Sequence, residues 1–321
     1  MHTYLRNKPA WIQLIIFGGL TVGIVFITSM LGISLVARFN HLSVMQIAGM
    51  GPADYARPEL AGVIKGLLVV QFFGIFFLPP LIFAYLADPH PLKYVGLKPP
   101  GKNSFILIGL ITMIAAYFTV AFLATMNESI VHLFPKATQK WVENGETDAN
   151  GMLDNILFMK GPADLIMPIF LVGALPAIGE ELFFRGILQK LFIQIFKSAL
   201  PGIIFTGFLF SVIHMQFMGF LPRMALGIIL GLLYWYSGSI FISMMGHFIF
   251  NSINILLIYF KVADLDSKNS TSVAFSLLGV VSLAAVVFLV NYLRKKSTTT
   301  YATEFPPLIQ NTLIDDPDHP A

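Results

Sequence analysis

The chain has 321 residues, of which 56% are hydrophobic and only 12% are charged, and its mean hydropathy is +0.77. An ordinary globular chain is about 25% charged, so a soluble fold would lack the polar residues needed to cover this much apolar surface. Intrinsic disorder is excluded as well, because disordered chains are rich in charge and poor in apolar residues. The composition therefore predicts a protein embedded in a lipid bilayer.

Charge and cysteine content narrow the set of partners. The chain carries 20 Lys+Arg against 17 Asp+Glu, a net charge of +3, and shows no basic patch. We therefore expect the lipid bilayer as a partner and no nucleic acid. The chain contains no cysteine, which excludes disulfide bonds, thiolate metal ligands and a cysteine nucleophile.

Long apolar runs define the predicted architecture. A helix that crosses about 30 Å of hydrocarbon needs about 20 residues. We count eight apolar runs that approach or exceed this length, at residues 11–37, 60–87, 104–127, 166–193, 201–220, 223–237, 240–260 and 274–293. Polar, turn-rich connections separate them, and no internal repeat is visible. The sequence thus predicts an all-α, polytopic transmembrane helical bundle of about eight spans, with a polar catalytic cavity in its C-terminal half.

The order of the spans predicts the domain organisation and the orientation. We expect a cytoplasmic N-terminus, accessory spans 1 to 3 with their loops, a catalytic membrane core, a last span and a disordered cytoplasmic tail, at residues 1–10, 11–159, 160–260, 261–296 and 297–321. Alternating spans place ten Lys and Arg residues in short flanks on the side of both termini and five on the other side. The positive-inside rule then predicts cytoplasmic termini in a cell or inner membrane. We expect the active site to open to that same side.

Two adjacent carboxylates lie in the middle of the fourth predicted span, in the stretch A-L-P-A-I-G-E-E-L-F-F-R-G. Of the 17 Asp and Glu residues, only Glu180 and Glu181 lie inside a span and away from its ends. A carboxylate at mid-bilayer costs roughly 3 kcal/mol or more and usually marks function. Glu181 and Arg185 are four residues apart and can pair on one helix face, whereas Glu180 has no such partner. The alternative is that these charges only register one helix against another.

Polar side chains in two later spans complete a predicted site. Of the seven histidines, only His214 and His247 lie within spans. Phe210 precedes His214 by one helical turn, and Asn251 follows His247 by one turn. These polar groups and Glu180 all lie within about 6 Å of rise from the middle of their spans. Buried polar groups at one depth are satisfied by coming together, so the sequence predicts a shared cavity.

The residue types in this set indicate water activation. One Glu and one His can hold and deprotonate a water molecule, while a second His and an Asn amide can donate hydrogen bonds to an oxyanion. The alternative is a zinc site with Glu180, His214 and His247 as ligands, although we expect no cofactor. The chain contains neither H-E-x-x-H nor G-x-S-x-G. Gly227-x-x-x-Gly231 is typical of close helix packing.

Three motifs in successive predicted spans resemble one protein family. Glu180-Glu181-x-x-x-Arg185, Phe210-x-x-x-His214 and His247-x-x-x-Asn251 are similar to those of the CPBP intramembrane proteases, the CAAX-protease and bacteriocin-processing or Abi family. The resemblance covers about residues 160–260. It implies that Glu180 and His214 activate the hydrolytic water and that His247 and Asn251 line the oxyanion hole. It further implies that Glu181 and Arg185 hold the site, in an enzyme of glutamate type or metallo type.

The resulting functional hypothesis is an intramembrane endopeptidase. By resemblance, its substrate is a membrane-embedded or lipidated polypeptide, either a CAAX-type prenyl protein or a bacteriocin-like peptide. A proton-coupled transporter is a second hypothesis, because Glu and His chains also form proton relays. Transporters, however, usually show repeated halves, which this sequence lacks. A third hypothesis is an immunity or scaffold member of the same family that binds a partner without cutting it.

Overall fold

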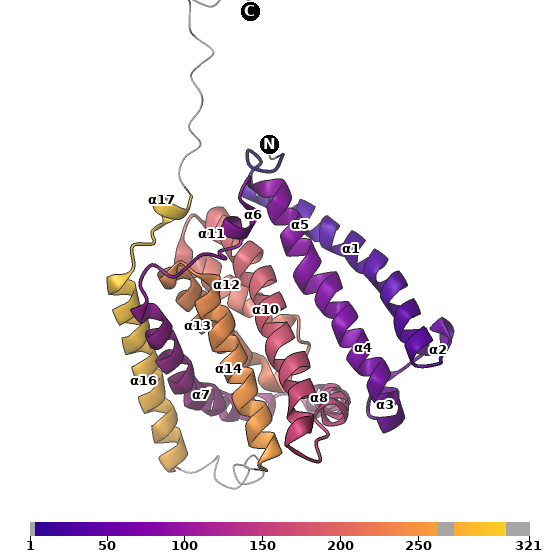
Figure 1. The fold of residues 1–321 in the computed structure, drawn as a ribbon. Helices are drawn as coiled ribbons and strands as arrows, with labels where there is room; N and C mark the ends of the chain where they lie inside the picture. The colour runs from indigo at the N-terminus through magenta and orange to yellow at the C-terminus, as the bar shows by residue number, and fades with distance from the viewer. Residues whose placement is uncertain (1–3, 262–272, 306–321) are drawn as a thin grey trace, which may run out of the picture.

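The computed structural model describes residues 4–261 and 273–305, and within these ranges it contains helices and no strands (Figure 1). Seven helical stretches are long and apolar enough to cross a membrane: Ala10–Phe39, Pro58–Ala87, Ser104–Val131, Pro162–Phe196, Phe217–Ser237, Ile240–Tyr259 and Ala274–Lys296. The predicted all-α, multi-pass membrane architecture is therefore confirmed. The number of spans is close to the eight that we expected.

Four of the membrane-length stretches are single α-helices, and the other three also contain 3₁₀- or π-helical segments. The first three spans are α1 (Ala10–Phe39), then η1 (Pro58–Leu60), α4 (Ala61–Gln71), η2 (Phe72–Phe77) and α5 (Leu78–Ala87), then α7 (Ser104–Val131). The fourth comprises η3 (Pro162–Leu165), α9 (Ile166–Pro168), η4 (Ile169–Ala174), α10 (Leu175–Glu181), η5 (Leu182–Leu188) and α11 (Gln189–Phe196). The last three are η6 (Phe217–Gly219) with α13 (Phe220–Ser237), then α14 (Ile240–Tyr259) and α16 (Val273–Lys296).

The fifth predicted span is shorter than expected. Its helix, α12, runs from Ala199 to Val212, and 14 residues at 1.5 Å each give only about 21 Å of rise. The chain then turns through residues 213–219, with Met215 in the left-handed region at φ 54°. The prediction of one helix over 201–220 is thus wrong in its second half. His214 follows the helix instead of lying at its centre.

Shorter helices lie in the connections between the spans: α2 (Val44–Ala48), α3 (Pro52–Tyr55), α6 (Pro91–Tyr94) and α8 (Lys136–Ile156). One more, α17 (Tyr301–Glu304), follows the last span. The polar connection before the fourth span was expected to be a loop, but it contains the 21-residue helix α8. In Figure 1, α8 lies at the end of the bundle opposite to both termini.

Two of the spans approach each other closely where the backbone is π-helical. The fourth span contains the π-helices η4 and η5, and the second contains η2. Gly179 of α10 lies against η2, because an added Cβ would come within 2.7 Å of the Phe76 Cβ. Such turns are often found at functional sites, and here they bring the second span against the residues around Glu180.

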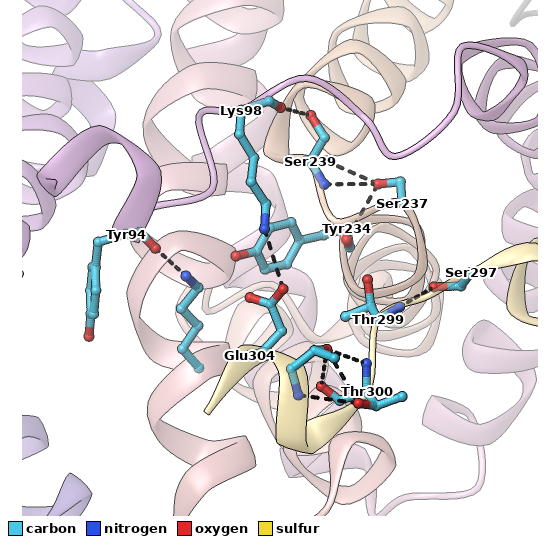
Figure 2. Close-up of polar contacts among 11 residues, drawn as sticks. Tyr94, Lys98, Tyr234, Ser237, Ser239, Ser297, Thr299, Thr300 and Glu304 are labelled. Atoms are coloured by element: carbon cyan, nitrogen blue, oxygen red, sulfur yellow. Dashed lines mark hydrogen bonds and ion pairs between the residues drawn. The ribbon is translucent and has the colours of Figure 1, made fainter. Parts of the chain in front are cut away.

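The segment after α16 packs onto the bundle (Figure 2). Glu304 of α17 forms an ion pair with Lys98, at 3.3 Å between Oε1 and Nζ. Phe305 contacts the apolar cluster of Ile193, Ile203 and Trp235. The prediction of a disordered tail over 297–321 is therefore wrong for residues 297–305, because an ion pair and apolar contacts hold them. Residues 306–321 lie outside the described residues.

Candidate active site

Glu181 is the centre of a fully buried polar network. Its side chain is inaccessible to solvent. Its Oε1 accepts hydrogen bonds from Arg185 Nη1 at 2.7 Å and from His247 Nδ1 at 2.9 Å. Its Oε2 accepts a hydrogen bond from the Ser243 hydroxyl. The predicted pairing of Glu181 with Arg185 is confirmed, and this carboxylate has several partners, as buried charges require.

Arg185 connects the fourth span to two neighbouring helices. Its Nη2 donates a hydrogen bond of 2.8 Å to the carbonyl oxygen of Gly227 in α13. Its guanidinium carbon lies 4.9 Å from the centre of the Phe210 ring of α12, a cation–π contact. An added Cβ at Gly227 would come within 3.0 Å of the Gly207 Cα. The absence of a side chain at Gly227 thus lets α13 pack closely against α12, and Arg185 contacts both of these helices.

Glu180 has a different environment from its neighbour. Its Oε2 lies 4.0 Å from His247 Nε2, which is beyond hydrogen-bond distance and leaves room for a bridging atom. The residue is 9% exposed, and it lines a recess of about 430 Å³ between the second and fourth spans. We call this space the lateral recess; its other lining residues are Leu68, Gln71, Phe72, Phe76, Leu171, Leu175 and Pro176. One carboxylate is thus fixed by partners and the other faces a cavity.

His214 and His247 both contact the ring of Phe210. The ring centres are 5.0 Å apart for Phe210 and His214, and 5.9 Å apart for Phe210 and His247. His214 Nδ1 donates to the Phe210 carbonyl oxygen at 2.7 Å, so Nε2 of a neutral ring carries the lone pair. Electrostatic interactions link His214 to Glu180 and His247. The ring of Phe210 is therefore the common support of both histidines.

The position of His214 also bears on the expected orientation of the site. The loop that carries His214 contacts α8, because Glu146 of α8 accepts a hydrogen bond from the backbone N–H of Met218. In Figure 1, α8 lies at the end of the bundle away from both termini. His214 therefore lies toward the end of the bundle that carries α8, and the expectation that the site opens on the side of the termini stays a prediction.

Asn251 binds a backbone carbonyl that a proline leaves free. Its Nδ2 donates to the Val172 carbonyl oxygen at 3.0 Å. In an α-helix this carbonyl would accept from the N–H four residues later, but residue 176 is a proline and has no N–H. One of the two amide hydrogens of Asn251 thus fixes the side chain against η4. The other hydrogen remains for a further acceptor.

Sequence reasoning missed one residue of this network, Ser243. It lies four residues before His247, which itself lies four before Asn251, so all three share one face of α14. The spacing was visible in the sequence. A serine within an apolar run, however, carries little signal until the buried carboxylate that it contacts is known.

The described side chains do not form a group of three or more His, Asp or Glu residues placed to hold a metal ion. His247 Nδ1 is engaged with Glu181, and His214 Nδ1 is engaged with a backbone carbonyl. The alternative zinc ligands Glu180, His214 and His247 are not such a group, even though Nε2 of each ring, opposite the engaged Nδ1, is the atom that would bind a metal.

The fold and the site define a polytopic membrane protein with a buried carboxylate–histidine centre. Residues 162–253 match the family described as type II CAAX prenyl endopeptidase Rce1-like. This segment contains all three motifs, from Glu180 to Asn251, so the resemblance is confirmed over it. The chain is 27% identical over 128 residues to the uncharacterized protein YpbD of Bacillus subtilis (strain 168). The matched segment covers 39% of this chain and 61% of YpbD. No solved structure matches the chain.

Proposed function

We propose that the protein is an intramembrane endopeptidase that hydrolyses a peptide bond of a membrane-associated polypeptide. The observation that carries this proposal is the 4.0 Å distance between Glu180 Oε2 and His247 Nε2, together with the position of Glu180 in the lining of the lateral recess. A water molecule or a substrate oxygen that lies to one side of the line between the two atoms can hydrogen-bond to both. The match of residues 162–253 to an Rce1-like family makes a prenylated C-terminus of CAAX type the first substrate class to test, with a bacteriocin-like peptide as the second.

The lateral recess suits an apolar substrate. Its walls are leucine, phenylalanine and proline side chains, and the polar groups among them are Gln71 and Glu180. Binding sites typically combine an apolar lining with a few polar groups that orient the ligand. In the proposal, a lipid chain or an apolar peptide segment contacts these walls while the scissile bond lies next to Glu180.

Glu180 is the proposed base. It removes a proton from a water molecule that His214 orients through its Nε2, and the water oxygen attacks the peptide carbonyl carbon. The carbonyl oxygen becomes an oxyanion, and collapse of this intermediate breaks the C–N bond. Glu180 returns its proton to the leaving nitrogen, so the products are a carboxylic acid and an amine. Glu181 and Arg185 hold the site and take no proton.

His247 and Asn251 are the proposed oxyanion donors. In the proposal His247 is the imidazolium, protonated on both ring nitrogens, so its Nε2–H and the second hydrogen of the Asn251 amide donate to one oxygen. His247 Nδ1–H meanwhile remains bound to Glu181. Preorganised donors of this kind are typically worth about 3–4 kcal/mol, or 10²–10³ in rate.

A proton-coupled transporter is the weaker alternative. A relay requires carboxylates that change partners, whereas Glu181 is held by Arg185, His247 and Ser243 at once. An immunity or scaffold protein of the same family would keep the site and lack turnover. Cleavage of peptides by the purified protein distinguishes an enzyme from such a protein.

The proposal is tested with purified protein and a panel of prenylated and unprenylated peptides. We expect wild-type protein to cleave a member of this panel, and Glu180→Gln to abolish cleavage at an unchanged melting temperature, because it removes the base and keeps the shape. Cleavage by Glu180→Gln at the wild-type rate would refute the assignment of the base. Wild-type protein that binds the peptides without cutting them would favour the hypothesis of an immunity or scaffold protein.

Asn251→Ala in the same assay tests the oxyanion hole. We expect kcat to fall by about 10²–10³ while KM stays within a few-fold, since the donor acts on the transition state. A normal kcat with a depressed melting temperature would leave Asn251 as a packing residue.

We further propose that no metal is needed. Stoichiometric zinc, with activity lost on chelation and restored by zinc, would instead make His214 and His247 ligands.

We also propose, from the Lys and Arg bias, that both termini are cytoplasmic. Because the chain has no cysteine, single cysteines report the topology cleanly. An impermeant maleimide added to intact cells should label a Glu143→Cys variant on α8 and spare a Ser297→Cys variant. The reverse pattern would invert the orientation.

A further inference from the structure

The loop that carries His214, residues 213–219 including η6, is held by contacts from α7 and α8 and by hydrogen bonds to its own flanking helices. Because α12 spans only about 21 Å, this loop begins within membrane depth instead of beyond it. Irregular backbone at such depth is tolerated only where protein satisfies its polar groups. The contacts that do so therefore decide where His214 lies.

Asn127 of α7 makes three of these contacts. Its Nδ2 donates to the carbonyl oxygens of Phe217 at 2.8 Å and of Met218 at 2.7 Å. Its Oδ1 accepts from the backbone N–H of Leu221 at 3.1 Å. The residue is 4% exposed, so its amide is fully committed to the backbone that follows His214.

Helix α8 supplies the second set of contacts. Glu146 Oε1 accepts from the backbone N–H of Met218 at 3.0 Å. The centre of the Trp141 ring, five residues earlier on α8, lies 5.1 Å from the centre of the Phe217 ring. The same two loop residues, Phe217 and Met218, are thus held from α7 through their carbonyls and from α8 through a ring and an N–H.

The loop is also closed on itself. Arg223 Nη1 donates to the Gln216 carbonyl oxygen at 2.9 Å, and Ser211 Oγ donates to the Phe220 carbonyl oxygen at 2.7 Å. These bonds join the end of α12 to the start of α13. A displacement of Phe217 and Met218 is therefore transmitted to His214, three residues earlier in the same short loop.

We propose that Asn127 and Glu146 are positioning residues that set the place of His214 in the active site. Neither belongs to the three motifs, and neither contacts another site residue directly. Both act by fixing the backbone three to seven residues beyond His214. Helix α8 thus helps to position the active site through Glu146, in addition to connecting two spans. The catalytic part of the inference rests on the proposed function.

The chain offers a matched control in Asn155, also on α8. Its Nδ2 donates to two carbonyl oxygens, those of Tyr55 at 3.2 Å and Arg57 at 2.8 Å, but it holds a different turn. Asn127→Ala should lower kcat by about 10²-fold, the effect expected of a misplacement near 1 Å, with KM within a few-fold. Asn155→Ala should leave kcat within two-fold.

Two comparisons separate positioning from plain stability. Glu146→Ala should lower kcat, whereas Glu146→Gln keeps an acceptor oxygen for Met218 N–H and should retain activity near that of the wild type. In a His214→Ala background, Asn127→Ala should cause no further loss of kcat, because both changes act through one group. Additive losses, or equal effects of Glu146→Ala and Glu146→Gln, would overturn the inference.

A measurement that needs no catalysis completes the test. Single His214→Cys protein should react with a maleimide faster when Asn127→Ala or Glu146→Ala is added, and at an unchanged rate when Asn155→Ala is added. Unchanged rates with all three would overturn the inference even in a protein that cuts peptides. If the wild type cleaves no peptide, the proposed function fails, and the labelling rates still decide whether these residues hold the loop.

Discussion

The first and fourth spans are built from similar apolar sequence and have different surroundings. In the most apolar part of α1 the mean hydropathy is 2.3 and 6% of the residues are buried in the protein, whereas in the most apolar part of the span Pro162–Phe196 the mean hydropathy is 1.7 and 44% of the residues are buried. The less apolar span is thus the more buried one. In a bilayer the lipid is as apolar as leucine, so helices associate through small and polar residues instead of through hydrophobicity.

Individual residues show the same contrast. An added Cβ at Gly18, Gly19 or Gly23 of α1 would meet nothing within 4 Å. An added Cβ at Gly231, which faces the fourth span, would come within 2.6 Å of Gln189 Oε1. Gln189 Nε2 also donates to the Gly231 carbonyl oxygen at 3.1 Å, one turn beyond the bond from Arg185 to Gly227. Small residues and polar side chains together make the fourth span an interior element.

The largest loss of unfolding free energy is expected on replacing the buried carboxylate Glu181. Glu181→Gln leaves Arg185 buried without its ion partner, and breaking such a pair typically costs about 3–5 kcal/mol. Thermal or denaturant unfolding in detergent micelles measures this change. The matched control is Glu59→Gln, where a carboxylate that is 73% exposed lies 3.8 Å from Arg57; pairs of this kind contribute about 0–1 kcal/mol. Equal losses of stability in the two variants would remove the distinction.

Smaller changes in the free energy of unfolding are expected at two glycines, Gly231 and Gly23, and the two changes differ in sign. Gly231→Ala should lower the free energy of unfolding by about 1–3 kcal/mol, because the new methyl group overpacks the contact with Gln189. Gly23→Ala should leave it unchanged or raise it by up to about 1 kcal/mol, because alanine is the better helix former and the site is open. The same unfolding assay compares both variants. Destabilisation by Gly23→Ala would show that α1 has a packed neighbour there.

Much of this contrast could be predicted from the sequence. The apolar runs fix the all-α architecture, and the four-residue spacing of Glu181 and Arg185 predicts the ion pair that the structure contains at 2.7 Å. Such features follow from local spacing, which does not depend on how distant helices pack.

The rest depends on contacts between distant segments. Residues 213–220 read I-H-M-Q-F-M-G-F, so hydropathy continues across the point where α12 ends and gives no sign of the turn. The turn exists because Asn127 and Glu146, 70 to 95 residues earlier in the chain, satisfy its backbone groups. Likewise, Ser243 acquires a role only because Glu181 packs against α14.

The π-helical turn η5 restricts which insertions and deletions this chain tolerates. A π-turn holds one residue more than the α-helical turn it replaces, so deleting one residue within 182–188 restores a regular helix. Side chains beyond the turn would then keep roughly their orientation relative to Glu181, because the deleted residue is the extra one that the turn accommodates. Gln189, which lies just beyond the turn, would still face Gly231, whereas Arg185 lies within the turn and would shift relative to Gly227. A deletion here is therefore a local change, whereas the same deletion in the regular helix α1 would rotate every later side chain by about 100°.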